Sequence, residues 1–372
     1  MVNGNNPTVV EIQCLRNAAW FAISTATVDG TKRDKYWKAW MTHCRRHYCS
    51  SGGSQATENS TDRLLTFAVA VREGQYGLGA TVQVQSVERA LRHVAQRIIL
   101  DGHPDPRKAS PAQQHLDLPI SRLLKSYRDK DPPPQPKLAL PVSTIEAISR
   151  NYRWTEHQHA VADLVTIAFF YLLRVGEYTA PACSRTRRTI PLRKCDIRLW
   201  QKGVLLHHSA GINTLLSADS ATICIANTKN GTKGAVVHHE AFGGPLCPVA
   251  ALARRVANIG PGLDKCAINK VYHANGCTTT VTDRDIGTAV RWGASCDGLL
   301  AKGYTLNRIS SHSLRAGGAM AMKLSGLSDS TIMRVGRWTL LTYLTYIHTQ
   351  IGALTAGVAW RMSTAFIFQN VG

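Results

Sequence analysis

The decapeptide SSHSLRAGGA, residues 310–319, carries the pattern that decides the fold of this 372-residue chain. Its opening serines are good N-cap residues, so we expect a helix to begin there. His312 and Arg315 are three residues apart, so on that helix they share one face and can converge on one anion. Gly317 and Gly318 permit close helix packing, which would hold that face rigidly. Taken alone, a His/Arg pair of this kind is more often an ordinary surface pair.

A second pattern lies upstream, in the apolar stretch FFYLLRVGEY at residues 169–178. Arg174 stands at the end of so apolar a helix that its guanidinium is costly unless it meets an anion or emerges into a site. The alternative is an arginine satisfied by the helix dipole and the last carbonyl groups. Neither pattern is decisive without the other.

The chain continues with VGRWT at residues 335–339 and YLTYIH at residues 343–348. Arginine in a Leu-Leu-Arg-x-x-Glu context, a His-x-x-Arg box, a Gly-x-Trp and a tyrosine eight positions beyond resemble, in order and spacing, the tyrosine recombinase (phage integrase-type) family. The resemblance covers residues 140–350. The Arg-Trp spelling and the short gap to the tyrosine look most like recombinases of eukaryotic mobile elements. The resemblance implies a site-specific recombinase or integrase, a DNA strand transferase that needs neither metal nor ATP.

The resemblance also implies a role for each matching residue. Two arginines would hold the non-bridging oxygens of the scissile phosphate in bidentate forks, which a lysine cannot form. A tyrosine would attack the phosphorus and pass its proton to a histidine, giving a 3′-phosphotyrosyl link that can be religated through a four-way junction. A lysine would protonate the leaving 5′ oxygen, and an indole N–H would bind a phosphate oxygen. The implied catalytic set is Arg174, Lys229, His312, Arg315, Trp338 and Tyr346, with Glu177 orienting the site.

Three of these assignments keep an alternative. Lys229 fits the expected β-hairpin best, and Lys233, four residues later, is its alternative. Tyr343 lies one helical turn before Tyr346 and is a rival nucleophile. Where many family members have histidine directly after the glycine, this chain has Arg337, so the donor role passes to the tryptophan that follows. Arg337 could nevertheless be the group that contacts the phosphate.

The composition favours a polyanionic partner. The chain has 44 Lys and Arg against 24 Asp and Glu, a formal net charge of +20, and its 44% hydrophobic residues suffice for folded cores. A folded chain this basic predicts a nucleic-acid partner, because Lys and Arg release condensed counterions from phosphates. The resemblance implies that this partner is double-stranded DNA. One dense basic run is either a DNA-contacting segment or a solvated charged face: Arg185, Arg187, Arg188, Arg193 and Lys194.

A proline cluster at residues 132–136 predicts where the chain divides. Four prolines in five positions cannot continue a helix and favour extended polyproline II geometry, so we expect an interdomain linker over residues 129–141. Residues 1–128 show helical periodicity and predict a helical bundle, which the resemblance implies is a core-DNA-binding domain. The resemblance likewise implies that residues 142–372 form a catalytic domain with a C-terminal tail. Its expected elements include a helix at 155–178 and strands at 203–206, 221–225 and 235–238. The expected fold class is therefore mainly α with a small antiparallel β-sheet (α+β).

Further expectations concern assembly and surroundings. The apolar tail after Tyr346 should be buried, either on its own domain or, as the resemblance suggests, in a neighbouring protomer of a tetramer. No stretch is apolar enough to predict a membrane span. No metal or cofactor is expected. One cluster of possible zinc ligands has no second pair of ligands at zinc-finger spacing: His43, Cys44, His47 and Cys49. Scattered cysteines suggest a reducing compartment, nuclear if the source is eukaryotic and otherwise cytoplasmic.

Two other functions stay open from the sequence. A type IB topoisomerase would use the same tyrosine and arginines to relax one duplex. A non-catalytic DNA-binding protein derived from a mobile element would keep the fold without the reaction. The presence of every candidate catalytic residue favours an enzyme, although presence is not activity.

Overall fold

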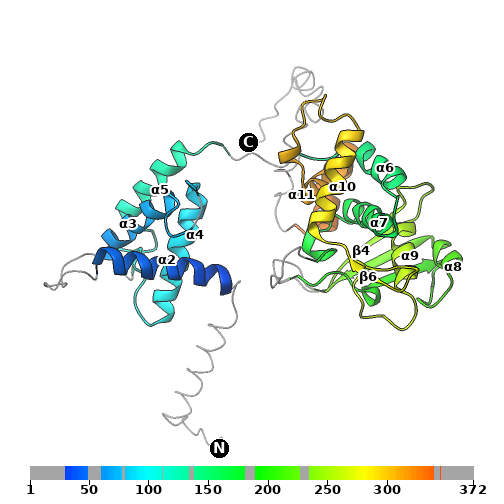
Figure 1. Cartoon of the computed structure of the whole chain (residues 1–372), viewed down its shortest axis with the longest axis horizontal. Coiled ribbons are helices and arrows are strands. Elements are labelled where there is room, and N and C mark those ends of the chain that lie inside the picture. Colours follow the sequence, from blue (N-terminus) through cyan, green and yellow to red (C-terminus); the bar gives the residue numbers. More distant parts are fainter. Residues whose placement is uncertain are drawn as a thin grey trace, which may run out of the picture. The chain divides into compact units, whose positions relative to one another are not determined.

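The computed structural model describes residues 30–48, 60–77, 80–110, 112–133, 138–180, 189–226, 234–338 and 344. The chain forms two compact units, residues 1–134 and residues 135–372, which are described separately (Figure 1). The boundary between them falls inside the proline cluster, where extended polyproline geometry is favoured over helix.

Unit 1 is helical in its described part, with a core of its own. The helices are α2 (Gly30–Tyr48), α3 (Ser60–Arg72), α4 (Val84–Leu100) and α5 (Leu118–Lys130). Apolar residues recur at helical spacing in α4, so that Val87, Leu91 and Val94 face inward. They pack with Phe67 of α3 and Ile120 of α5 in one buried cluster.

Both ends of the predicted linker belong to the folded units. At the start, Asp131 follows α5 and its Oδ2 accepts a hydrogen bond from Val84 N–H at 2.6 Å, at the beginning of α4. At the end, Leu138 N–H donates to Arg308 O at 3.1 Å and Leu140 N–H to Ser313 O at 3.2 Å. Leu138 and Leu140 are buried, because apolar side chains gain free energy by joining the unit 2 core.

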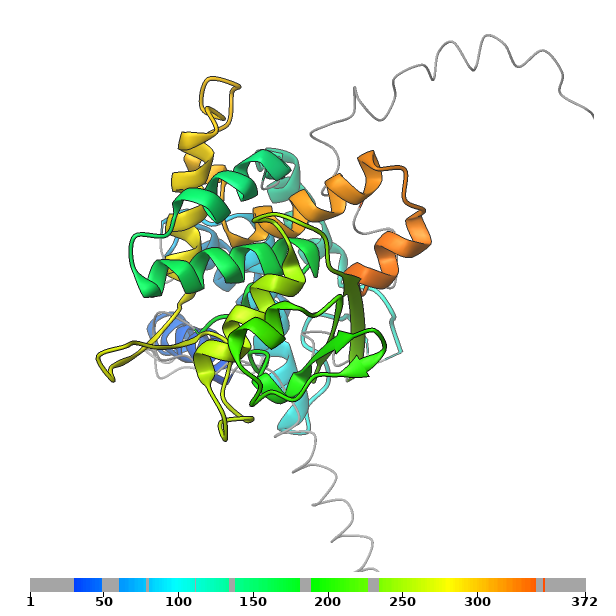
Figure 2. The same ribbon diagram turned by 90° about the vertical axis from the view of Figure 1, so that its right-hand side faces the viewer.

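Unit 2 combines a group of helices with a small sheet. Its larger helices are α6 (Val142–Asn151), α7 (Glu156–Phe170), α8 (Ile212–Leu216), α9 (Pro248–Ile259), α10 (Asp283–Cys296), α11 (Ser311–Leu324) and α12 (Asp329–Gly336). Three short 3₁₀ turns are η1 (Val175–Glu177), η2 (Lys194–Asp196) and η3 (Leu306–Arg308). The central α7 is buried along nearly its whole length and packs against α6, α9, α10 and α11 (Figure 2).

The sheet is antiparallel and has the strand order β2-β1-β3-β4. These strands are β1 (Ile197–Gln201), β2 (Val204–Leu205), β3 (Ser220–Ile225) and β4 (Ala235–Glu240), and a separate pair is β5 (Lys270–Tyr272) with β6 (Thr278–Thr280). Buried and partly buried residues alternate along β3, as a strand with one face on the core requires. The arrangement confirms the predicted fold class, mainly α with a small antiparallel sheet.

Two local expectations differ from the structure. The expected helix at 155–178 ends at Phe170, because Leu172 adopts a left-handed backbone with φ 48° and Leu173 N–H turns back to Ala168 O at 3.0 Å. This helix-ending turn satisfies the last carbonyl groups without further helix. Strand β1 was not expected, because the alternation of apolar and polar residues over 197–201 is short and directly follows the basic run. In the described part of the chain, no helix combines the length and apolarity needed to cross a membrane.

Candidate active site

The first arginine lies just beyond the end of α7, where the backbone leaves the helix. Arg174 precedes η1 in an extended conformation, and its backbone N–H donates to Glu177 Oε2 at 2.8 Å. Its Nη1 donates to Glu177 Oε1 at 3.2 Å, so both oxygens of that carboxylate hold the arginine. The Glu177 side chain is fully buried, whereas that of Arg174 is 17% exposed. The Arg174 side chain therefore reaches the surface, while the buried Glu177 carboxylate holds both its backbone N–H and its guanidinium.

The second arginine is carried by α11, whose sequence positions it by close packing. Ser310 caps the helix by accepting a hydrogen bond from His312 N–H at 3.3 Å. A Cβ at Gly317 would lie 2.2 Å from Leu140 O, and one at Gly318 would lie 2.3 Å from Phe169 O. Only glycine allows α11 to approach the end of α7 this closely, as the sequence predicted.

Arg315 points from α11 into the protein and is 1% exposed. Its Nη1 donates to Leu172 O, and its Nη2 donates to Gly336 O. Its guanidinium carbon lies over the ring of Trp338, with 4.3 Å between Cζ and the ring centroid. The indole can fold back in this way because residue 336 is glycine: a Cβ there would lie 1.8 Å from Trp338 Cζ3.

Arg337 ends α12 in a left-handed conformation with φ 55° and turns its side chain inward. Its Nη2 donates to Glu177 Oε2 at 2.8 Å and to Leu172 O at 3.0 Å, and its Nη1 donates to Tyr171 O at 3.3 Å. Burial lowers the pKa of Arg337, while the ion pair with Glu177 opposes this shift. The guanidinium thus ties the end of α12 to the turn after α7.

The structure brings these groups into one set of shared partners, here named the arginine centre: Arg174, Glu177, Arg315, Arg337 and Trp338. Glu177 joins two of the arginines, and Leu172 O accepts from two. Three guanidiniums against one carboxylate leave two positive charges in a largely buried place. Such a place suits an anion with more than one negative charge.

The remaining predicted catalytic residues differ in how far the structure describes them. His312 lies in the first turn of α11 and is exposed, three residues before the buried arginine of the same helix. Lys229 and its alternative Lys233 lie outside the described residues, between β3 and β4, which pair antiparallel with Ile225 opposite Ala235. Tyr346 and its alternative, Tyr343, also lie outside the described residues, as does the tail.

The predicted DNA-contacting run is only partly described. Arg185, Arg187 and Arg188 lie outside the described residues. Arg193 makes a bidentate contact with Asp196, in which Nε donates to Oδ2 at 3.0 Å and Nη2 donates to Oδ1 at 2.8 Å, and it stays partly exposed. Lys194 is a correction: it is fully buried, and its Nζ donates to Gly260 O at 2.5 Å and lies 3.5 Å from Asp264. A buried ammonium needs such partners and does not face solvent, where a phosphate would approach.

The contacts of Arg337 with Glu177 are what the sequence reasoning missed. The sequence offered a weak signal, an arginine at the position after a helix-terminal glycine where the family pattern has histidine. Nothing in the spacing indicates that this side chain turns toward residue 177, because the two are 160 positions apart.

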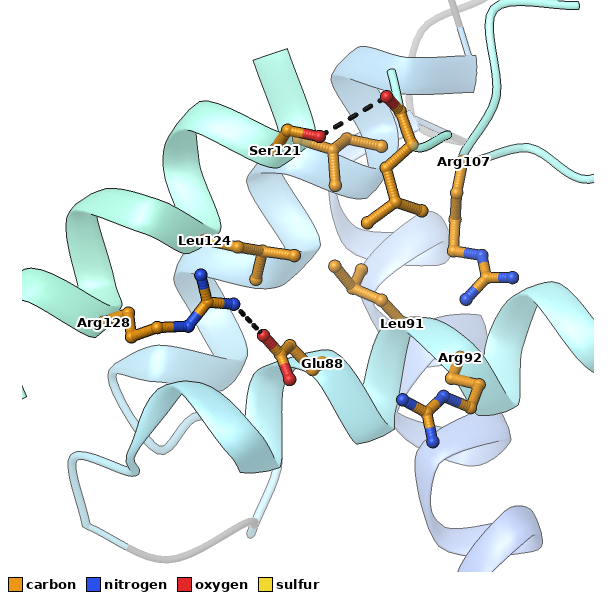
Figure 3. Close-up of a pocket in the computed structure, with 9 residues that line it drawn as sticks. Glu88, Leu91, Arg92, Arg107, Ser121, Leu124 and Arg128 are labelled. Carbon is orange, nitrogen blue, oxygen red and sulfur yellow. Dashed lines mark hydrogen bonds and ion pairs between the residues drawn. The ribbon is translucent and has the colours of Figure 1, made fainter. Parts of the chain in front are cut away.

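Unit 1 offers two features away from the arginine centre. A cavity of about 340 Å³ has an apolar floor that includes Leu91 and Leu124, and three arginines lie around it: Arg92, Arg107 and Arg128 (Figure 3). Arg128 pairs with Glu88 at 2.6 Å.

The second feature of unit 1 is His43, both of whose ring nitrogens take part in protein hydrogen bonds, to Tyr76 Oη at 2.8 Å and to Thr66 Oγ1 at 3.1 Å.

In comparisons with known proteins, the chain matches solved structures only. No protein-family profile matches it, and no curated protein matches it. The XerH site-specific recombinase bound to a palindromic difH substrate is similar at a TM-score of 0.53 and 15% identity, over 88% of this chain and 79% of that one. The Tn1549 transposon integrase with transposon right-end DNA gives a TM-score of 0.48 at 11% identity, over 93% and 98%. A lambda integrase dimer on a COC′ core site gives 0.44 at 9% identity, over 97% and 98%.

The likeness to XerH shows that the chain has the fold of a recombinase of this kind. At this level of identity the likeness concerns the arrangement of the elements. The chemistry has to be argued from the residues of this chain.

Proposed function

We propose that the chain is a site-specific tyrosine recombinase, which cleaves and rejoins double-stranded DNA through a 3′-phosphotyrosyl intermediate. The observation that carries the proposal is the arginine centre. Arg174 and Arg315 are 141 positions apart in the sequence, yet both are held by partners of Arg337: one by Glu177 and the other by Leu172 O. Two guanidiniums that are each fixed by a partner shared with Arg337 suit a phosphate in a transition state with two negative charges. The fold likeness to XerH, a site-specific recombinase, supports the same reading.

The reaction needs a nucleophile that can attack the phosphodiester without a metal ion or ATP. We assign this role to Tyr346, whose phenol oxygen attacks the phosphorus while its proton passes to His312. The bond from phosphorus to the 5′ oxygen breaks, and Lys229 protonates that oxygen as it leaves. The phosphotyrosyl ester keeps the energy of the original bond, so attack by a 5′ hydroxyl of another strand restores a phosphodiester.

Charge stabilisation in this scheme falls to groups of the arginine centre. Arg174 and Arg315 hold the non-bridging oxygens, and Trp338 donates its indole N–H to a phosphate oxygen. Removal of one such donor typically slows a reaction by about 10²–10³-fold. The double charge of the pentacoordinate phosphorus is matched by the two net positive charges of the centre.

Exchange between two sites requires more than one subunit, and we propose that the C-terminal tail docks into a neighbouring protomer. Four subunits on two duplexes would then resolve a four-way junction. A type IB topoisomerase would act alone on one duplex, so relaxation of supercoiled DNA by the monomer, without exchange between sites, would favour that alternative.

The test is capture of the covalent intermediate. The purified chain is incubated with a library of nicked duplexes of random sequence, and protein that stays attached to DNA in SDS is isolated. We expect an adduct whose modified peptide contains Tyr346. The Tyr346→Phe variant should form no adduct and should bind the selected duplex with an affinity within about threefold of the unmodified chain, because the lost oxygen acts in chemistry and not in binding.

Tyr343→Phe is the matched control and should keep the adduct. An adduct that persists in Tyr346→Phe and vanishes in Tyr343→Phe would move the nucleophile by one helical turn. No adduct from the unmodified chain with any duplex of the library would contradict the proposed reaction itself and would leave DNA binding without catalysis.

A further inference from the structure

We propose that Arg337 is a positioning residue: it sets the geometry of the two phosphate-binding arginines through Glu177 and Leu172 O and does not itself touch the scissile phosphate. This inference rests on the proposed function. It concerns the position where the family pattern would lead one to expect a phosphate-binding histidine, and it assigns that position a different task in this chain.

The first argument is the direction of the side chain. The Arg337 side chain is 6% exposed, and its donors Nη1 and Nη2 are directed to Glu177 and to the carbonyl groups of Tyr171 and Leu172. Its Nε is buried as well and has no hydrogen-bond partner among the described residues. The donors of Arg315 meet neutral carbonyl groups, whereas Nη2 of Arg337 meets the Glu177 carboxylate, so less of the charge of Arg337 is available to a phosphate.

The second argument is the backbone that carries it. With φ 55°, Arg337 adopts a conformation that glycine reaches more easily than any residue with a Cβ. Backbone strain of this kind persists where the surrounding contacts offset it. Here those contacts are an ion pair and hydrogen bonds to two carbonyl groups, all of which the side chain makes within the turn after α7.

The third argument is that Arg337 shares a partner with each of the other two arginines. Glu177 Oε2 accepts from Arg337 at 2.8 Å while Oε1 accepts from Arg174 at 3.2 Å. Leu172 O accepts from Arg337 at 3.0 Å and also from Arg315. Because the carboxylate is divided between two guanidiniums, it neutralises less of the charge of Arg174, which stays available for an anion.

The consequence is a specific expectation for the loss of this side chain. In Arg337→Gln, the buried carboxylate faces Arg174 alone and Leu172 O loses a donor. Both phosphate-binding arginines then lose their fixed positions, although neither is altered. DNA binding, which depends on many phosphates over a large surface, should change little.

The experiment uses the full chain and the duplex selected by the adduct assay, at saturating DNA in single turnover. We expect Arg337→Gln to slow adduct formation by about 10- to 100-fold, with a DNA Kd within about threefold of the unmodified chain. Arg337→Lys should recover part of the rate, since an ammonium can meet Glu177 but cannot also bridge two carbonyl groups. Arg334→Gln removes an exposed arginine from the same helix and should leave the rate within about twofold.

A second substrate separates positioning from direct contact. It carries a methylphosphonate at the scissile position, which removes one negative charge from the phosphorus centre. The loss caused by Arg315→Ala should shrink on this substrate, because there is less charge to neutralise. The loss caused by Arg337→Gln should stay the same, because misplaced neighbours are not repaired by a neutral substrate. In the double variant with Glu177→Gln, the loss should not exceed that of the larger single variant.

Each contrary result has a distinct meaning. Recovery of Arg337→Gln on the methylphosphonate would show direct contact with the phosphate and overturn the inference, as would equal rates for Arg337→Gln and the unmodified chain. A rate loss matched by the loss of folded protein in thermal melts would reduce Arg337 to a stability role and also overturn it. Absence of any adduct from the unmodified chain would instead refute the proposed function.

Discussion

Arg315 is costly to bury, because a guanidinium that is 1% exposed has given up nearly all of its water. Two carbonyl groups and the face of Trp338 take the place of that water. The partners belong to two segments that are far apart in the sequence, the turn after α7 and the end of α12. The orientation of the arginine is therefore set by the protein's own groups, which is the preorganisation that electrostatic catalysis requires.

His43 gives a prediction at the same scale. Burial, with a smaller contribution from nearby His47, lowers the pKa of His43 from 6.5 to about 4. The unfolded chain binds this proton more readily, so His43 contributes stability that is complete above pH 6.5 and is lost as the pH falls towards 4. We expect the free energy of unfolding to drop by about 1–2 kcal/mol over this range on account of His43.

Urea unfolding of the full chain across this pH range measures the effect. His43→Gln should flatten the pH dependence relative to His115→Gln, which removes an exposed histidine of the same unit. Identical pH slopes for the two variants would mean that His43 titrates as freely in the folded chain as in the unfolded one.

At the scale of elements, the site depends on how closely α11 approaches the end of α7. A Cβ at Gly318 would lie 2.3 Å from Phe169 O and 2.4 Å from Leu172 Cδ2, and backbone cannot yield as a flexible side chain can. Leu172 O, which accepts from both Arg315 and Arg337, belongs to the turn that directly follows α7. The packing of the two helices and the geometry of the arginine centre are therefore coupled through one contact.

We expect Gly318→Ala to destabilise the chain by about 3 kcal/mol, because α11 must move away from α7 to admit the methyl group. Gly287→Ala is the matched control: a Cβ there meets only the Arg291 side chain, at 3.4 Å and beyond, so helix propensity should make it neutral or stabilising by up to about 1 kcal/mol. Thermal melts of the two variants measure the difference. A Gly318→Ala protein as stable as the Gly287→Ala protein would show that the two helices can separate without cost.

For the whole molecule, the dominant property is a formal charge of +20 carried by a folded chain. Charge of this size binds a duplex mainly by releasing condensed counterions, so affinity for DNA should depend steeply on salt. We expect the Kd for the selected duplex to rise by about 10³–10⁵-fold between 50 and 200 mM KCl, the range for about 6–10 phosphate contacts. Fluorescence anisotropy over a salt series provides the measurement. A change of less than tenfold would mean that few phosphates are contacted and that the positive surface serves another purpose.

The sequence determined what depends on local pattern and on order along the chain. Helical periodicity predicted helices in the first third of the chain, and short apolar runs flanked by turn residues predicted three of the strands. The domain boundaries expected from the proline cluster stay a prediction. The glycine pair in SSHSLRAGGA indicated a close helix contact before its partner was known. Patterns of this kind can be read locally because they reflect the geometry of one helix or one strand.

Only the tertiary structure decided which distant groups share partners. It ended α7 at Phe170 rather than at 178, buried Lys194, and turned Arg337 towards a carboxylate 160 positions away. Each of these outcomes follows from competition among neighbours brought together by folding: carbonyl groups that need donors, a carboxylate that needs counter-charge, and a buried ammonium that needs both. Spacing in a sequence does not encode such competition, because its members are adjacent only in space.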